Sequence, residues 1–474
     1  MSNALWTSRD AAQATQGVVK SDWSAVGVSI DTRTLDLGDL FVALVGDHSD
    51  GHAHVKDALA NGAAAAMVSQ ACEGVSDEGL LCVGDTLEGL QALGRAARAR
   101  TDAKIVAVTG SVGKTSTKDA LRTILEAQGR AHGSVASYNN HWGVPLTLAR
   151  MPADTDWGIF EIGMNHSGEI TPLSKMVQPD VAIVTTVEPV HLAHFASVEA
   201  IADAKAEIFD GLKPGGTAIL NADNPHFDRL QSRAMAGGAG RVIAFGKSEK
   251  ADARLEKIAL HPNCSCVSAS ICGEAITYKL GVPGEHHVMN SLAILSAVYA
   301  LGADLALAGL ALASLSAPKG RGERHLVQAE DRQFLVVDES YNANPASMRA
   351  AIATLGAAEV QRSGRRIAVL GDMLELGADE VSLHRGLSGP LRDAKIDSVY
   401  ACGPLTQSLY DDLPVEARAG YTVDSQALLD QLALEVRDGD VVMIKGSLGS
   451  RMGLIVEGLL ALHNEKNAPV GAGD

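Results

Sequence analysis

The stretch Ile-Val-Ala-Val-Thr-Gly-Ser-Val-Gly-Lys-Thr-Ser, residues 105–116, decides the fold of this chain. Its apolar start, residues 105–108, predicts a buried parallel strand, and residues 117–128 predict a helix. The glycine-rich turn between them lets backbone N–H groups point at phosphate oxygens, while the helix N-terminus adds partial positive charge. Lys114 can reach the terminal phosphates of a nucleotide, and the Thr115 hydroxyl can bind Mg²⁺. The stretch therefore predicts a phosphate-binding loop, whose residues are Thr109, Gly110, Ser111, Val112, Gly113, Lys114, Thr115 and Ser116.

The loop is shorter than the usual phosphate-binding pattern, G-x-x-x-x-G-K-[ST]. That pattern would place a glycine at position 108, where this chain has Val108. The plainer interpretation is a Gly-Ser turn that binds nothing. Phosphate binding is favoured because Lys114 and Thr115 fall in the first turn of a helix that directly follows a strand.

Length and composition indicate a globular protein of more than one domain. The chain has 474 residues, of which 46% are hydrophobic and 20% charged, and about two to four domains are expected at this length. The net charge of −17 argues against non-specific binding to nucleic acid. No apolar run approaches the roughly 20 residues of a membrane span, and residues 1–10 lack the apolar core of a signal peptide. We therefore expect a cytoplasmic protein without a membrane span or a nucleic-acid partner, and we expect a monomer.

Hydrophobic patterning divides the chain into three regions, which we predict to be domains of residues 1–83, 84–317 and 318–474. The first is a small α/β unit, with strands expected at residues 26–31, 40–45 and 64–69 and a helix at 54–61. In the middle region strands alternate with helices, which predicts a doubly wound, mostly parallel sheet. Its further strands are expected at residues 157–162, 181–186, 217–221 and 241–245, followed by a hairpin at 267–280 and a helix at 288–301.

The third region begins at a Pro-Lys-Gly-Arg-Gly hinge, residues 318–322. A new alternation of strands and helices then predicts a second open sheet of the Rossmann type. Its strands are expected at residues 334–337, 366–370, 398–401 and 441–445. The predicted fold class is therefore α/β with three domains, of which the middle one carries the phosphate-binding loop.

Two side chains of the middle region fall at strand ends. Glu161 lies at the carboxyl end of one predicted strand, and His191 lies just beyond the next. Open α/β sheets bind ligands at this edge, and a carboxylate beside a phosphate loop is a natural Mg²⁺ ligand. The alternatives are a capping or ion-paired glutamate and a structural histidine. For His191, the edge that it shares with Glu161 and the loop favours a functional role.

Three further polar residues of the middle region are less informative when taken alone. Lys205 lies in a helical stretch, residues 201–209, where a lysine taken alone is expected to be solvated. Asn139 and Asn140 lie in a turn-rich segment, and their amides could either bind a polar ligand or close an Asx turn.

The strands of the third region also end in polar loops. Residues 337–345 place two carboxylates and an Asn-rich turn after a strand, with a helix expected after Pro345. Similar loops follow at residues 371–377 and 445–452. These loops could face a nucleotide across an interdomain cleft, although ordinary turn chemistry accounts for part of them.

Together these segments resemble the Mur ligase family over nearly the whole chain. Each segment alone is a weak signal, but their joint occurrence in this order is specific, and the shortened phosphate loop is the one that this family shows. The resemblance is carried by residues 29–33, 38–44, 50–52, 109–116, 139–140, 143–148, 161–165, 204–209, 338–345 and 371–373.

The resemblance implies three domains that hold, in chain order, the UDP end of a muropeptide, ATP with two Mg²⁺ ions, and an incoming dipeptide. Within the family the chain is most similar to the ligases that add D-alanyl-D-alanine to UDP-N-acetylmuramoyl-tripeptide through an acyl phosphate. This reaction is the last cytoplasmic step in the synthesis of the peptidoglycan precursor, the pentapeptide. The alternatives are another ligase of the superfamily, such as a folylpolyglutamate synthetase or a different Mur ligase, and a nucleotide-binding switch without ligase activity. Such a switch would not need Glu161, His191 and Lys205 together.

The resemblance also implies roles for individual residues. The catalytic residues would be Lys114, His191 and Lys205, the last as a carbamate that binds a second Mg²⁺. The Mg²⁺ ligands would be Thr115, Glu161, His191 and Lys205, and the ATP contacts beyond the loop would be Asn290, Arg321 and Asp338. The substrates would contact Ser29, Asp31, Thr32, Arg33, Asn139, Asn140, Tyr341, Asn342, Asn344, Ser447 and Arg451. The chain departs from the family at Glu339, where many relatives carry Asp, so that Asp338 is the alternative nucleotide contact.

Overall fold

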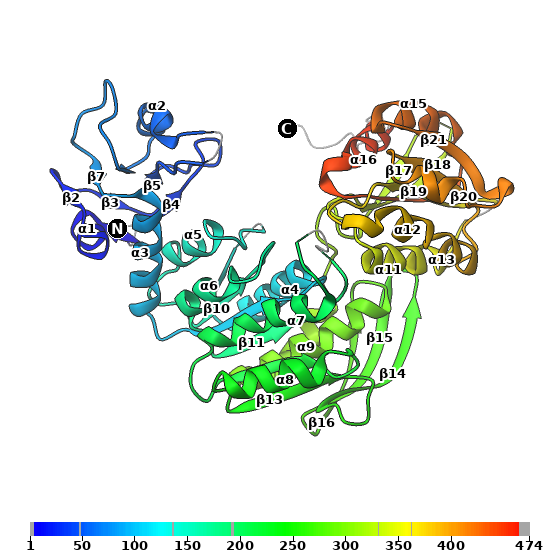
Figure 1. Cartoon of the computed structure of the whole chain (residues 1–474), viewed down its shortest axis with the longest axis horizontal. Coiled ribbons are helices and arrows are strands. Elements are labelled where there is room, and N and C mark those ends of the chain that lie inside the picture. Colours follow the sequence, from blue (N-terminus) through cyan, green and yellow to red (C-terminus); the bar gives the residue numbers. More distant parts are fainter. Residues whose placement is uncertain are drawn as a thin grey trace, which may run out of the picture.

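The computed structural model describes residues 4–46, 49–134, 137–190, 194–329, 331–361 and 363–463. The chain forms three α/β units, with the N-terminal and C-terminal units at opposite ends of the middle one (Figure 1). The predicted α/β class with three units is therefore confirmed. Among the described residues, no helix is both long and apolar enough to cross a bilayer.

The N-terminal unit contains a five-stranded sheet with the order β2-β7-β6-β5-β4 and a two-stranded sheet of β1 and β3. The strands are β1 (Trp6–Thr7), β2 (Val18–Val19), β3 (Ser24–Ala25), β4 (Gly27–Ser29), β5 (Asp39–Val42), β6 (Ala65–Val68) and β7 (Leu80–Cys82). The helices are α1 (Ser8–Thr15) and α2 (Val55–Ala60). The three predicted strands and the predicted helix of this region are all present, with shorter bounds.

The core of the N-terminal unit extends into the middle unit. Leu40 and Met67 of the sheet pack in one buried cluster with Leu90 of α3 (Thr86–Ala99) and Leu146 of α5 (Gly143–Ala149). Hydrogen bonds cross the same boundary: the Trp6 indole donates to the Ala149 carbonyl at 2.8 Å, and the Arg100 guanidinium donates to the Leu5 and Met151 carbonyls. The first two units are therefore joined by shared packing as well as by the chain.

The middle unit is built on a nine-stranded sheet with the order β16-β15-β14-β13-β12-β11-β8-β10-β9. All pairs from β9 to β14 are parallel, and β14, β15 and β16 form antiparallel pairs. The strands are β8 (Lys104–Thr109), β9 (Ala131–Gly133), β10 (Trp157–Glu161), β11 (Val181–Val184), β12 (Thr217–Asn221), β13 (Arg241–Gly246), β14 (Ala253–His261), β15 (Cys264–Ile271) and β16 (Glu274–Leu280). The helices are α4 (Lys114–Glu126), α6 (Ile170–Val177), α7 (Val198–Ala206), α8 (Phe227–Ala236), α9 (Glu285–Leu301) and α10 (Leu305–Leu312).

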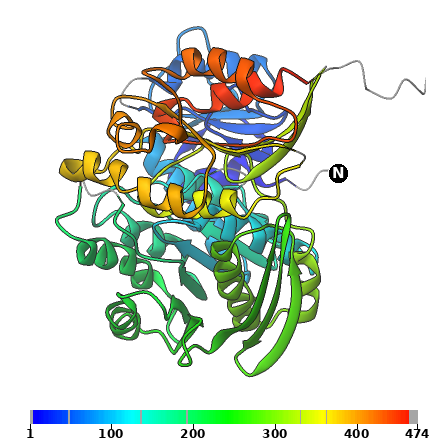
Figure 2. The same ribbon diagram turned by 90° about the vertical axis from the view of Figure 1, so that its right-hand side faces the viewer.

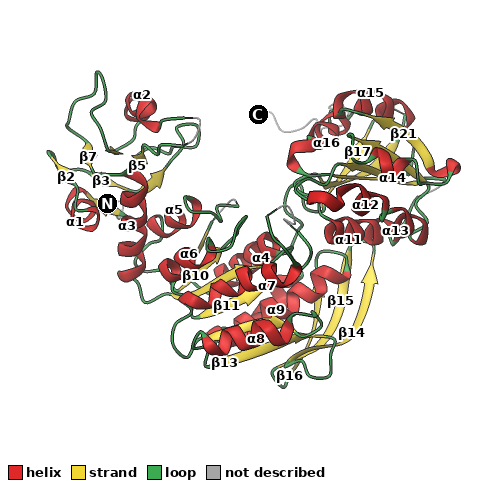
Figure 3. Ribbon diagram, in the orientation of Figure 1, coloured by secondary structure: helices red, strands yellow, loops and turns green. Residues whose placement is uncertain are grey.

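The C-terminal unit is a six-stranded sheet with the order β17-β18-β22-β19-β20-β21, in which only the edge strand β17 is antiparallel. Helices cover both faces (Figure 3), with α11 in one buried cluster and α15 and α16 in the other. The strands are β17 (Glu323–Gln328), β18 (Gln333–Glu339), β19 (Arg366–Gly371), β20 (Ser398–Cys402), β21 (Arg418–Thr422) and β22 (Val441–Lys445). The helices are α11 (Pro345–Gly356), α12 (Glu380–Arg385), α13 (Ser388–Asp393), α14 (Gln407–Tyr410), α15 (Ser425–Glu435) and α16 (Gly453–Leu460).

The middle and C-terminal units touch beyond the hinge at residues 318–322. The long strands of the middle unit, green in Figure 2, rise toward the C-terminal sheet. At the β14–β15 turn, the half-buried Arg324 guanidinium of β17 donates a 2.7 Å hydrogen bond to the Pro262 carbonyl. This contact holds the C-terminal sheet over the carboxyl ends of the middle strands.

Candidate active site

A cavity of about 510 Å³ lies between the middle and C-terminal units. The middle unit contributes the phosphate-binding loop and the carboxyl ends of β10 and β11. The C-terminal unit contributes the hinge, the ends of β18 and β22, and the start of α11. Ligands of open α/β sheets bind at strand ends of this kind, and here two such edges face one cavity.

The backbone of the phosphate-binding loop packs closely against two side chains, those of Thr185 and Asn290. A Cβ atom on Gly110 would lie 1.9 Å from the Thr185 hydroxyl, and one on Gly113 would lie 2.8 Å from the Asn290 amide nitrogen. Both glycines also have positive φ, at 149° and 83°, which other residues rarely adopt. The Thr185 hydroxyl donates to the Val112 carbonyl at 2.6 Å, which fixes the loop to the end of β11.

Lys114 begins α4, as predicted, and its side chain folds back over the loop. Its ammonium donates to the Gly110 carbonyl at 2.8 Å. Burial lowers the pKa of Lys114, nearby Glu161 raises it, and Arg321 lowers it again. Arg321, from the hinge, stacks its guanidinium 4.3 Å above the ring of Tyr341. The loop therefore faces two cations, one from each unit, which suits an anionic ligand.

Glu161 ends β10 at the back of the cavity and is 2% exposed. One carboxylate oxygen, Oε1, accepts a 2.7 Å hydrogen bond from the Asn139 amide, whereas buried Oε2 has no hydrogen-bond partner. A buried carboxylate oxygen without a partner is costly, and a divalent cation would satisfy it. Glu161 is neither a cap nor ion-paired among the described residues, and with the Thr115 hydroxyl at the start of α4 it provides oxygen ligands that fit Mg²⁺.

Lys205 is 2% exposed, so the interpretation of it as a solvated helix lysine is wrong. It lies near the end of α7 and makes no ion pair within the described part of the chain. Burial, reinforced by the charge of Lys114, holds the pKa of Lys205 well below that of a free lysine. This shift favours the neutral amine over the ammonium, and a neutral amine is the form that reacts with carbon dioxide.

Glu207 links the helix of Lys205 to the loop that follows Glu161. Its carboxylate is 8% exposed and accepts four hydrogen bonds from that loop and from the N-terminus of α6. The donors are the Ser167 hydroxyl and the backbone N–H groups of Gly168, Ile170 and Thr171. Sequence reasoning missed this role, although Glu207 stands in the segment that carries Lys205.

The two asparagines of the turn-rich segment, Asn139 and Asn140, make different contacts. The Asn140 side chain accepts from the backbone N–H groups of Trp142 and Gly143 and starts α5, so it closes an Asx turn. Asn139 instead reaches the cavity and binds Glu161. The remaining residue predicted here, His191, lies outside the described residues.

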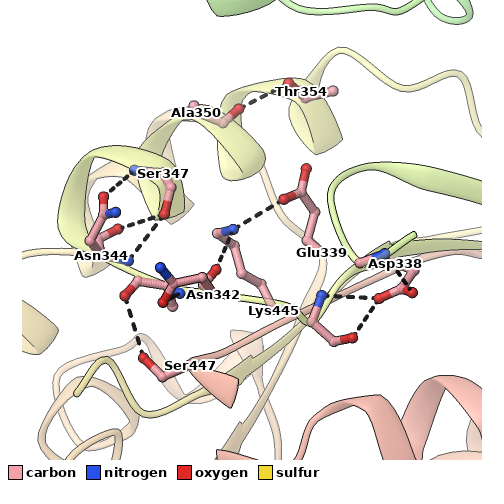
Figure 4. A network of polar contacts seen from close by, with 12 residues as sticks. Asp338, Glu339, Asn342, Asn344, Ser347, Ala350, Thr354, Lys445 and Ser447 are labelled. Carbon is pink, nitrogen blue, oxygen red and sulfur yellow. Dashed lines mark hydrogen bonds and ion pairs between the residues drawn. The ribbon is translucent and has the colours of Figure 1, made fainter. Parts of the chain in front are cut away.

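The C-terminal wall of the cavity is an ordered polar network (Figure 4). Buried Lys445 donates to Glu339 Oε2 and to the Asn342 carbonyl, both at 3.0 Å. Asn344 caps α11 through a reciprocal bond with Ser347. The Ser447 hydroxyl accepts from the Leu374 N–H at 3.0 Å, so it ties two strand-end loops together.

The other predicted residues divide between the cavity and places outside it. Asn290 lines the cavity. Asp338 accepts from the backbone N–H groups of Gly320 and Ser340 and from the Ser340 hydroxyl, which shows that it braces the hinge. Arg451 is exposed and does not line the cavity, although it stands in the loop after β22.

The residues predicted for the UDP end lie in the N-terminal unit, away from the cavity. Buried Ser29 ends β4, and its hydroxyl donates to the Asp31 carbonyl at 3.0 Å. Asp31 pairs with exposed Arg33 at 2.6 Å, and this pairing lowers the pKa of the Asp31 carboxyl. Thr32, between them, is half-buried. The structure therefore places this group at the carboxyl end of the N-terminal sheet.

Comparison with known proteins agrees with this architecture. Residues 25–112 match a family described as "Mur ligase family, catalytic domain", residues 108–298 match "Mur ligase middle domain", and residues 320–448 match "Mur ligase, glutamate ligase domain". A UDP-N-acetylmuramoyl-tripeptide--D-alanyl-D-alanine ligase of Rickettsia prowazekii (strain Madrid E) is 31% identical over 453 residues, which cover 96% of this chain and 99% of that protein. The chain belongs to the Mur ligase family. The predicted resemblance is thus confirmed.

Solved structures of family members superpose on most of the chain. MurF from Acinetobacter baumannii has a TM-score of 0.83 at 28% identity and covers 96% of this chain and 99% of its own. The MurF ligase of Thermotoga maritima, in complex with ADP, has a TM-score of 0.76 at 26% identity and covers 92% of this chain and 97% of its own. This Mur ligase therefore shares the arrangement of all three units with these relatives.

Proposed function

We propose that this Mur ligase joins D-alanyl-D-alanine to UDP-N-acetylmuramoyl-tripeptide and converts ATP to ADP and phosphate. The observation that carries the proposal is the buried, partnerless oxygen of Glu161, which lies with Lys114 at one wall of a cavity between two sheets. The names of the Rickettsia relative and of the MurF structures support this choice of substrates. A simple nucleotide switch has no need of a second, C-terminal sheet that closes the cavity.

The first step of the proposed reaction brings two anions together, a carboxylate and the γ-phosphate of ATP. The tripeptide carboxylate attacks the γ-phosphorus of ATP, which gives an acyl phosphate and ADP. The dipeptide amine then attacks the acyl carbon, and the tetrahedral intermediate collapses to the amide and phosphate. Two anions meet first, so Lys114 and the loop N–H groups would neutralise the charge that develops on the phosphate. Bound Mg²⁺ would supply further neutralisation.

The Mg²⁺ ligands remain a prediction that the donor set supports. Thr115 and Glu161 offer two oxygens beside the loop, and His191 is predicted to join them. A carbamate on Lys205, formed from its neutral amine and carbon dioxide with loss of a proton, would add two more oxygens. The depressed pKa of Lys205 supports that modification, because only the unprotonated amine reacts.

The adenine of ATP is proposed to lie behind the loop. A smaller cavity of about 220 Å³ opens there between α4, α9 and the hinge. Apolar side chains of Val282, Leu315 and Ala317 line it together with the Asn290 amide, which suits a flat base with a polar edge. Arg321 then approaches the phosphates from the hinge.

The remaining substrates are proposed to bind between the units. The group from Ser29 to Arg33 would hold the UDP end, and Asn139 would meet the tripeptide end at the cavity. We further propose that the enzyme acts as a monomer in the cytoplasm.

The proposal is tested by phosphate release in the presence of ATP and Mg²⁺. We expect release that requires both UDP-N-acetylmuramoyl-tripeptide and D-alanyl-D-alanine, together with formation of the pentapeptide by mass. Release with neither substrate would instead indicate a simple nucleoside triphosphatase. Lys114→Ala should abolish release and keep the fold, whereas Lys175→Ala, an exposed lysine on α6, should leave release unchanged.

A further inference from the structure

Lys445 lies where two neighbouring strands of the C-terminal sheet are followed by helices on opposite faces of that sheet. It ends β22, and its neighbour in register, Glu339, ends the adjacent parallel strand β18. The helices that follow these strands, α16 and α11, cover opposite faces of the sheet. Between two such strands the loops part and leave a crevice, which is the usual ligand site of an open α/β sheet.

The Lys445 ammonium is buried but not fully satisfied. The residue is 2% exposed, and its nitrogen donates to Glu339 Oε2 and to the Asn342 carbonyl, both at 3.0 Å. Figure 4 shows both contacts. An ammonium has three N–H donors, and among the described residues only these two acceptors meet it. Its side chain lines the large cavity, so the third donor is available to a ligand there.

The position of Lys445 favours a carboxylate over a phosphate. The phosphate side of the cavity already has the loop N–H groups and Lys114, and Arg321 lies close enough to Lys114 to lower its pKa. Lys445 comes from the other sheet. A dipeptide whose amine attacks an acyl phosphate near the loop carries its own carboxylate about 7 Å further along the chain. That span would carry the carboxylate toward the C-terminal wall of the same cavity, where Lys445 lies.

We propose that Lys445 binds the terminal carboxylate of the incoming dipeptide and selects for it. The inference rests on the proposed function and adds a specificity residue to it. Glu339 holds the ammonium in place and also repels a second carboxylate, which tunes affinity for the dipeptide. Glu339 is the position at which this chain departs from many relatives.

The test compares the dipeptide acid with its C-terminal amide, D-alanyl-D-alaninamide, at saturating ATP and muropeptide. We expect the wild-type enzyme to prefer the acid by roughly 10- to 100-fold in kcat/KM, the value of one charged hydrogen bond. Lys445→Met should lower kcat/KM for the acid by that factor and leave the amide unchanged, so that the preference disappears. Lys445→Arg should retain the preference, because the positive charge remains.

Several results would overturn the inference. A wild-type enzyme that ligates acid and amide equally well excludes it, even if Lys445→Met does not fold. A Lys445→Met variant that keeps the preference, or that loses acid and amide alike and raises the KM for ATP, excludes it too. Failure of the wild type to ligate either dipeptide would instead refute the proposed function itself. Lys279→Met, an exposed lysine on β16, serves as the control and should behave as wild type.

Discussion

Replacement of Glu207 by glutamine should weaken both the stability and the Mg²⁺ response of the enzyme. Each Glu207 oxygen accepts two hydrogen bonds, Oε1 from Ser167 and Gly168 and Oε2 from Ile170 and Thr171. A carboxamide retains one acceptor oxygen and turns an NH₂ group toward two of the donors. With a charge-assisted hydrogen bond at about 1.5 to 3 kcal/mol, we expect a loss of about 3 kcal/mol. In a unit of about 200 residues this lowers Tm by roughly 6–12 °C.

The functional readout is the Mg²⁺ concentration at half-maximal phosphate release. The loop that Glu207 holds begins just after Glu161, so Glu207→Gln should raise this concentration several-fold while the KM for the dipeptide stays constant. Glu169→Gln is the matched control, because this exposed carboxylate accepts from Asn165 in the same loop and should change Tm by less than about 1–2 °C. Unchanged Tm and Mg²⁺ response in Glu207→Gln, or equal effects in both variants, would refute the reasoning.

Three further perturbations test the site. Lys205→Ala should be nearly inactive and partly rescued by a short carboxylic acid, and full activity without the additive would exclude a carbamate. Asn139→Ala frees Glu161 Oε1 from its hydrogen bond, so it should raise the Mg²⁺ requirement in phosphate release by about tenfold, and an unchanged Mg²⁺ titration would show that this contact is dispensable. Burial lowers the pKa of His286 to about 4 and that of His287 to about 3, from 6.5. Between pH 6.5 and 4 the two histidines therefore bind protons in the unfolded chain but not in the folded one, so Tm should fall as the pH drops through this range. His286→Asn should make this fall less steep. A wild-type Tm that is constant over this range would contradict the burial argument.

Much of the fold is predictable because buried parallel strands are short apolar runs. The runs at 105–108, 181–186 and 441–445 are all strands of the structure. Strand β14, Ala253–His261, was not predicted because its residues are mostly exposed, with no apolar alternation. It is a strand because β13 and β15 supply backbone partners on both sides. The edge strand β17 was not predicted either, since only one of its six residues, Val327, is buried.

Site residues are predictable from the sequence where they lie at the end of a strand. They are less predictable where their role depends on side-chain contacts between distant parts of the chain. The sequence points to Glu161 by its place at the carboxyl end of β10, but its hydrogen bond with Asn139 joins residues far apart in sequence. The ion pair of Lys445 with Glu339 likewise arises only when β22 inserts beside β18. Lys205 was found by resemblance alone, since its helical setting gives no hint that the side chain is buried.

The packing shared by the first two units determines where the chain can be divided. A cut near residue 84 would separate Leu40 and Met67 from Leu90 and Leu146, and so would leave each fragment with half of one apolar cluster. A cut within residues 318–322 would leave the buried clusters of the middle unit and those of the C-terminal unit intact. Two fragments made there should each fold, meet again through Arg324 and Pro262, and rebuild the cavity on mixing. This chain is therefore better suited to a split-enzyme reporter divided at the hinge than to exchange of its N-terminal unit.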